Sequence, residues 1–268
     1  MRHASLLLRV SPMSSELIVG RHGAVLHLTI NRPEKRNALA LALLDEIGAT
    51  LTSHASDPGI LCAVITGAGD KCFAAGGDLQ ELDAIRSAAD TRAMSRRGRA
   101  ALDQVRAFPV PVIAALNGPA LGGGAELALA CDLRIAAPHA EIGFLQSQLA
   151  VTTAWGGGID LALTVGDRRA LRILATAARI APGRALELGL VDWVCAPGQA
   201  LESCIETFLE PYLCRSRAVL EGCKAPVAAA RRRAHAELAG VEEERFISSW
   251  TSDEHWAAVA ALAKSQGR

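Results

Sequence analysis

Apolar runs that alternate with turn residues divide the first 200 residues into short strands and helices. Continuous apolar runs at 24–30, 61–66 and 110–116 are bounded by Asn, Pro or Gly, a pattern that predicts buried strands. Between the first two, apolar residues at helical spacing predict a helix over 39–54. The pattern also predicts a polar helix-forming stretch at 79–107, a short helix ending at 131, strands at 133–137, 140–144 and 190–195, and a helix at 168–178.

The strand pattern stops near residue 200, and the rest of the chain has a helical character. Thr251 and Glu254 have the spacing of a capping box, which predicts that a last helix begins there. One face of that helix would carry Trp256, Val259, Ala260 and Ala263. Buried strands alternating with helices predict an α/β fold with covered sheets. We expect the helical tail to pack on the body or on a neighbouring subunit.

Composition narrows the class of protein. The 268 residues are 50% hydrophobic and 21% charged, with 28 basic and 28 acidic side chains, which is typical of a globular protein without net charge. This balance argues against nucleic acid or an anionic membrane as the main partner. The most apolar stretch, 108–131, is interrupted by prolines, an asparagine and a glutamate, so no membrane span is expected.

The seven cysteines form no C-x-x-C pair and no disulfide-framework spacing, so we expect mostly buried thiols in a reducing compartment and no metal site. The first 15 residues are basic, contain serine and lack acids until Glu16. They are interpreted as a flexible N-terminal extension, with an organelle transit peptide as the alternative. The expected location is therefore cytoplasmic, or the mitochondrial matrix in a eukaryote.

Two glycine-rich loops follow buried strands and are the main candidates for chemistry. One covers 71–79 and the other covers 117–127, which runs directly into a helix. Glycines let backbone N–H groups converge on a ligand, and two such groups make an oxyanion hole. Neither loop fits a Walker A or a dinucleotide fingerprint, and no G-x-S-x-G elbow is present. Either loop alone could also be a simple tight turn.

Several segments in order resemble the crotonase superfamily of enoyl-CoA hydratases and isomerases, from about residue 15 to the end. The matching segments are 28–39 (LTINRPEKRNAL), 73–79 (FAAGGDL), 111–118 (PVIAALNG), 120–127 (ALGGGAEL), 131–132 (CD) and 185–191 (ALELGLV). The resemblance implies a spiral of ββα units with a C-terminal helical region, assembled as a homotrimer or homohexamer. It implies three parts: a flexible extension at 1–14, the core with the coenzyme A and oxyanion sites at 15–200, and a helical oligomerisation region at 201–268.

The resemblance also implies which residues bind an acyl-CoA thioester. The N–H groups of Gly77 and Gly123 would hold the thioester oxygen and stabilise an enolate. Other site residues are grouped by part of the substrate: Lys35, Arg36 and Ala38 at the coenzyme A end; Ala75, Asp78 and Leu79 along the adenine and pantetheine path; Trp155 and Gly122 at the acyl pocket. A plain packing role for Trp155 is an open alternative. Coenzyme A would enter only as part of the substrate, and no separate cofactor is implied.

Glu126 matches one of two catalytic glutamates of the hydratases, whereas the second matches Gln146 and is therefore lost. An amide cannot give or take a proton, so hydration by two carboxylates would be impaired. A neutral side chain also repels a carboxylated substrate less. The leading expectation is decarboxylation of a short malonyl-type acyl-CoA, as in the ethylmalonyl/methylmalonyl-CoA decarboxylase branch. The alternatives are an enoyl-CoA hydratase or double-bond isomerase, and a non-catalytic acyl-CoA-binding subunit.

Two charged runs in the tail have weaker implications. Residues 231–233 (Arg-Arg-Arg) are interpreted as a solvated helix face, with a coenzyme A phosphate or a subunit contact as alternatives. Residues 242–244 (Glu-Glu-Glu) follow Gly240 and are interpreted as favourable charges at a helix start.

Overall fold

The computed structural model describes residues 16–265, and the predicted extension at 1–14 lies outside them. A six-stranded sheet has the order β1-β2-β3-β4-β6-β9, and only its β1–β2 pair is antiparallel. The strands are β1 Leu17–His22, β2 Val25–Ile30, β3 Cys62–Gly67, β4 Val112–Leu116, β6 Leu133–Ala136 and β9 Trp193–Val194. A smaller sheet of two-residue strands joins β5 Ala120–Leu121, β7 Ile142–Gly143 and β8 Arg179–Ile180.

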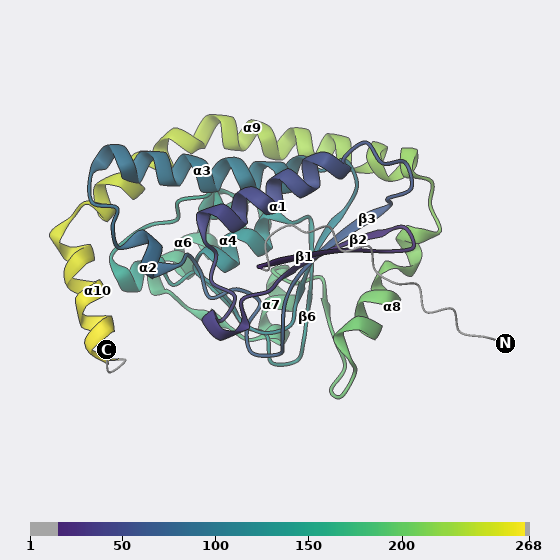
Figure 1. Ribbon diagram of the computed structural model, residues 1–268, viewed down its shortest axis with the longest axis horizontal. Coiled ribbons are helices and arrows are strands. Elements are labelled where there is room, and N and C mark those ends of the chain that lie inside the picture. Colours follow the sequence, from purple (N-terminus) through teal and green to yellow (C-terminus); the bar gives the residue numbers. More distant parts are fainter. Residues whose placement is uncertain (1–15, 266–268) are drawn as a thin grey trace.

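Ten α-helices surround these sheets within the described residues (Figure 1). They are α1 Leu41–His54, α2 Leu79–Leu82, α3 Ala88–Ala107, α4 Gly123–Ala130, α5 Gly157–Val165, α6 Asp167–Thr176, α7 Pro182–Leu188, α8 Leu201–Leu213, α9 Arg217–Trp250 and α10 Asp253–Ser265. Two short 3-10 helices lie at Pro33–Lys35 and Gln146–Leu149. In Figure 1 the long α9 runs beside α3, and α8 and α10 lie at opposite ends of the molecule.

Both faces of the central strands β3 and β4 are buried, which explains their continuous apolar runs. Ala63 and Ile65 of β3 pack into the larger core with α1, α3 and α4. Their neighbours Cys62 and Val64 point to the opposite face and pack against α8. The α/β class and the C-terminal run of helices are as predicted. Within residues 16–265, every helix is too short or too polar to cross a lipid bilayer.

Several local predictions need correction. The stretch at 79–107 contains two helices, because Ser87 caps α3 by accepting a hydrogen bond from the Asp90 N–H. Thr251 does not cap the last helix, since its hydroxyl donates to the Ile247 carbonyl while Ser252 accepts from the His255 N–H. The inner face of α10 consequently shifts to His255, Trp256, Ala258, Val259 and Leu262, and Ala260 and Ala263 are exposed.

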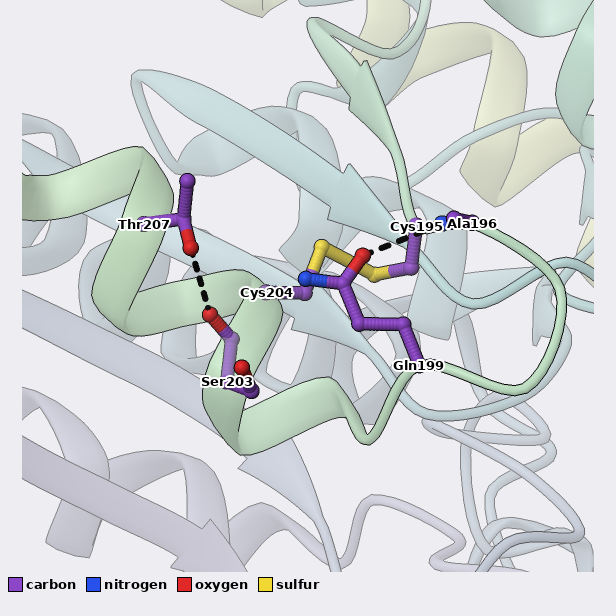
Figure 2. Close-up of a disulfide and its surroundings, with 6 residues drawn as sticks. All are labelled: Cys195, Ala196, Gln199, Ser203, Cys204 and Thr207. Atoms are coloured by element: carbon purple, nitrogen blue, oxygen red, sulfur yellow. Dashed lines mark hydrogen bonds between the residues drawn. A yellow bond between two sulfur atoms is a disulfide. The ribbon is translucent and has the colours of Figure 1, made fainter.

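The expectation that the cysteines are mostly buried thiols is wrong for four of the seven. Cys195, which follows β9, forms a disulfide with Cys204 of α8, at a Cα–Cα distance of 5.8 Å (Figure 2). This bond ties α8 to the edge of the large sheet. Cys62, Cys72 and Cys131 are buried thiols, whereas Cys214 and Cys223 are exposed. A nine-residue separation has no disulfide signature, so only the fold shows this pairing.

Candidate active site

The two glycine-rich loops lie side by side, and they follow the carboxyl ends of β3 and β4. Ala74 pairs with Ala120, and the Leu121 N–H donates to the Ala74 carbonyl at 2.9 Å. Two asparagines hold the first loop closed: the side-chain amides of Asn37 and Asn117 both donate to the Cys72 carbonyl, at 2.7 and 3.1 Å. Both asparagines occur in the matching segments, but the sequence does not reveal that they bind one carbonyl.

The amides of Gly77 and Gly123 are free to bind a ligand. Leu39 bonds to the Gly76 carbonyl and the Asp78 N–H, so in this parallel bridge the Gly77 N–H points away from Leu39. Gly123 is the first residue of α4, where an N–H has no partner inside the helix. Within residues 16–265 neither amide donates to another protein group. A Cβ on Gly76 would lie 3.5 Å from the Gly123 nitrogen, so the two loops are in contact here.

Trp155 packs directly over these two glycines. A Cβ on Gly123 would lie 2.4 Å from Cζ3 of the indole, and one on Gly77 would lie 3.7 Å from Cη2. The other edge of the ring packs against Gly98 of α3. The indole is 4% exposed and belongs to the main core. It is therefore both a core residue and a wall of the cavity beside the free amides.

Glu126, in the first turn of α4, is a buried carboxylate that is 2% exposed. Its Oε2 accepts hydrogen bonds from the N–H groups of Trp155 at 2.8 Å and Gly157 at 2.9 Å. Burial and the nearby charge of Glu242 raise the pKa of Glu126 to about 7, against the lowering effect of those amides. At neutral pH the side chain can therefore both donate and accept a proton.

Gln146 lies at the position where the resemblance implies a second carboxylate. Its Nε2 donates to Oε1 of Glu126 at 3.0 Å, while its own Oε1 is buried without a partner among the described residues. The amide therefore orients Glu126 and leaves one acceptor for a ligand. Only Glu126 can transfer protons in this pair.

All twelve residues that the sequence singles out line one cavity of about 960 Å3, and their chemical roles stay predictions. They are Lys35, Arg36, Ala38, Ala75, Gly77, Asp78, Leu79, Gly122, Gly123, Glu126, Gln146 and Trp155. The apolar part of the lining includes Leu82, Met94, Leu149, Phe246, Trp250 and Leu262. The lining also includes three cationic side chains: Lys35 and Arg36, which are exposed, and Arg179 of β8.

The carboxylate of Asp78 binds other groups of the protein. Its carboxylate accepts from Arg32 Nη2 at 2.7 Å and from the Gln80 N–H at 3.2 Å, and Lys35 Nζ lies 3.5 Å away. Burial works against ionisation, but the hydrogen bond and charge of Arg32 together with Lys35 lower the pKa of Asp78. Its carboxylate therefore fixes the first loop and the start of α2.

The charged runs of the tail have structural roles that the sequence does not predict. Arg231 is not solvated: its Nε binds Asp160 at 2.8 Å and its guanidinium donates to the last carbonyls of α4. Residues 242–244 lie inside α9, not at a helix start. Glu242 accepts hydrogen bonds from the N–H groups of Gly156 and Gly158 beside the cavity. Glu242 is far from Glu126 along the chain, so the sequence alone does not show that the two carboxylates bind the same turn.

Comparisons of this chain with known proteins agree on one family. A sequence profile of the enoyl-CoA hydratase/isomerase family matches residues 20–262. Enoyl-CoA isomerase/hydratase fer4 of Mycosarcoma maydis is 35% identical, covering 99% of this chain and 93% of its own length. Ethylmalonyl-CoA decarboxylase of Xenopus laevis is 30% identical over 90% of this chain and 79% of its own length. Crotonyl-CoA hydratase of Syntrophomonas wolfei is 41% identical over 65% of this chain, which spans 66% of that relative's length.

The fold agrees with a solved relative. An enoyl-CoA hydratase/isomerase from Mycobacterium paratuberculosis has a TM-score of 0.82 at 29% identity, covering 94% of this chain and all of its own. The predicted crotonase-like fold is thereby confirmed. The relatives' names favour hydratases and isomerases, with the decarboxylase a more distant match. This chain belongs to the enoyl-CoA hydratase/isomerase family of the crotonase superfamily.

Proposed function

We propose that this protein acts on an acyl-CoA thioester through an enolate, and that its reaction is decarboxylation of a short malonyl-type acyl-CoA. The amides of Gly77 and Gly123 would bind the thioester oxygen. The observation that carries the choice of reaction is the pairing of Glu126 with an amide, Gln146, at 3.0 Å. A decarboxylase needs one group that gives a proton, whereas hydration through two carboxylates needs a second acid at this position.

The reaction balances with the groups in the cavity. The bond between Cα and the substrate carboxylate breaks, carbon dioxide leaves, and the electron pair moves to the thioester oxygen as an enolate. Two amide dipoles aimed at that oxygen lower the barrier. The enolate then collapses and Cα takes the proton of Glu126, which solvent replaces. The apolar residues of the cavity lining would leave the substrate carboxylate poorly solvated, which favours its loss.

The coenzyme A part would lie beside Lys35 and Arg36. Both side chains are exposed and line the cavity, so either can reach a phosphate. Ala38, Ala75 and Leu79 add small or apolar surface to the same cavity.

The second candidate is isomerisation or hydration of an enoyl-CoA, as the names of the relatives suggest. The observation that favours isomerisation is the raised pKa of Glu126, about 7. A group with that pKa can remove a proton from one carbon and return it to another at neutral pH.

The pH dependence separates these candidates. Decarboxylation needs protonated Glu126, so kcat should fall as the pH rises through about 7. Isomerisation begins with ionised Glu126 as a base, so kcat should rise through the same pH. Initial rates from pH 5.5 to 8.5 with each substrate would show whether kcat falls or rises through this pH.

The direct test is a mass-spectrometric screen with methylmalonyl-, ethylmalonyl-, crotonyl- and 3-enoyl-CoA. Release of carbon dioxide from a malonyl-type thioester, lost by at least about 100-fold in Glu126→Gln, would support the proposal. Water addition or a double-bond shift without decarboxylation would overturn it in favour of the second candidate. Tight binding with no turnover of any substrate would identify a non-catalytic binder.

The variant Gln146→Glu tests whether the absence of a second carboxylate is what limits hydration. A second carboxylate beside Glu126 restores the pair that the resemblance implies for hydratases, so crotonyl-CoA hydration should rise by at least about 10-fold. Gln146→Met, which has a similar volume and no proton to give, is the control. If hydration stays at the Gln146→Met level, the lost acid is not what limits it.

A further inference from the structure

The turn at 153–158 lies between the carboxylates of Glu126 and Glu242, and each of these carboxylates accepts hydrogen bonds from backbone N–H groups of the turn. Trp155 and Gly157 donate their N–H groups to Glu126, at 2.8 and 2.9 Å. Gly156 and Gly158 donate theirs to Glu242, at 2.8 and 3.1 Å. Four successive amides therefore alternate between a carboxylate of α4 and a carboxylate of α9.

Glu242 is itself held rigidly. Its Oε1 accepts from the Thr153 hydroxyl at 2.6 Å, and its Oε2 pairs with Arg99 of α3. Arg99 also donates to the Ala154 carbonyl at 3.3 Å, so it binds both the turn and the carboxylate. The side chains of Glu242 and Arg99 are 9% and 11% exposed. The turn, α3 and α9 thus share one nearly buried network on the side of the turn opposite Glu126.

We propose that Glu242 is a positioning residue for Glu126: it fixes the turn whose amides bind the Glu126 carboxylate, and it places a second carboxylate on the other side of that turn. The proposal rests on the proton-transfer role given to Glu126 in the proposed function. It adds a charged residue of α9 to a site in which that helix otherwise contributes the apolar side chains of Phe246 and Trp250.

The electrostatics of the neighbourhood agree with this geometry. Burial and the charge of Glu242 both raise the pKa of Glu126, while Arg99 offsets part of the charge of Glu242. Gln146, the other side chain on Glu126, is neutral. A second charged cluster lies beyond Gly156, where the carboxylates of Asp160 and Asp103 balance the guanidinium groups of Arg106 and Arg231, and His235 also binds Asp160.

Two substitutions should move the proton affinity of Glu126 in opposite directions. Glu242→Gln removes a negative charge, so the pKa of Glu126 should fall by about one unit. The new amide can donate to the Thr153 hydroxyl while its oxygen accepts from Gly156, and the Gly158 N–H keeps the Thr153 hydroxyl as its acceptor, so the turn can be kept. Arg99→Gln removes the cation that offsets Glu242, so the pKa of Glu126 should rise. A loss of packing alone would not produce opposite shifts.

Glu243→Gln is the matched control. Glu243 is the next residue of α9, but it points to Arg92 and Arg96, at 2.9 and 2.8 Å, and touches no group of the turn. The same change of charge in the same helix should therefore leave the pKa of Glu126 within about 0.2 units of the parent.

The test is a pH titration of Glu126 by carbon-13 NMR of protein labelled at the glutamate carboxyl, with Glu126→Gln to assign the signal. A fall in Glu242→Gln, a rise in Arg99→Gln and no change in Glu243→Gln would support the proposal. An unchanged Glu126 titration in folded Glu242→Gln, or an equal shift in Glu243→Gln, would overturn it. The titration needs no turnover, so these shifts stand or fall separately from the substrate screen that tests the proposed function.

Discussion

At the scale of single residues, the site depends on how close side chains come to the backbone. Position 123 has room for a hydrogen only, because a Cβ there would lie 2.4 Å from the indole of Trp155. The indole cannot retreat easily, since its opposite edge is packed against Gly98. The geometry of the free amide is therefore set by an aromatic side chain from a different loop.

Gly123→Ala should consequently damage catalysis more than stability. The added methyl group displaces the indole or tilts the amide, and loss of one oxyanion donor costs about 100-fold or more in kcat. The measurement is kcat and KM with the substrate that the screen identifies. Gly222→Ala in α9, where a Cβ meets nothing within 4 Å, should leave both constants unchanged. Equal activity of the two variants would remove Gly123 from the proposed oxyanion site.

The residues of the candidate site are predictable in part. The glycine-rich loops are recognisable from the sequence itself, and the resemblance to the crotonase superfamily singles out Glu126 and Gln146. Glu242 was missed because its partners are backbone amides of a distant turn, and nothing in a run of three glutamates shows which one faces inward. The engagement of Asp78 by Arg32 was missed for a similar reason: it joins side chains from separate loops.

At the scale of elements, the length and packing of a segment decide whether its sequence reveals it. The buried strands β3 and β4 were predicted because both faces are apolar. Of the two-residue strands, β7 and β9 lie within the strands predicted at 140–144 and 190–195, whereas β5 and β8 are too short for any periodicity. Helix α7 was missed although Pro182 begins it and Gly189, at φ 76°, ends it, a signal that the sequence does contain.

Helix α9 is anchored to α4 and α5 by buried charge, so Arg231→Met should destabilise the fold. It removes the Asp160 ion pair and the cap on the α4 carbonyls, and breaking a buried pair costs about 3 kcal/mol in the free energy of unfolding. Arg233→Met is the control, because its pair with Glu237 is exposed and worth less than about 0.5 kcal/mol. Urea denaturation of both variants gives the comparison. Similar midpoints would mean that this anchor contributes little.

At the scale of the whole molecule, the disulfide joins the sheet edge to the helix that covers one of its faces. Reducing Cys195–Cys204 frees a short loop and should cost roughly 2–3 kcal/mol. The melting temperature should then fall by roughly 5 °C or more on adding dithiothreitol. A variant with both cysteines changed to serine should melt at the lower temperature with or without reductant. A parent protein unaffected by the reductant would contradict this assignment.

Assembly is the other property of the whole molecule that follows from the family resemblance. A homotrimer or homohexamer stays a prediction, and light scattering in solution would test it against the mass of three or six 28.1 kDa chains. Apolar side chains available for such contacts include Leu171, Val219 and Trp193, which are 69%, 51% and 44% exposed.

The free amides of Gly77 and Gly123 belong to the main chain, and this has a consequence for how such a protein changes over time. Replacing the side chain at 126 or 146 leaves both N–H groups in place. Under the proposed function, single replacements at these two positions would change the proton transfer on a backbone that still binds the same thioester oxygen. Binding of that oxygen would then be inherited with the main chain, and only the side chains around it would vary.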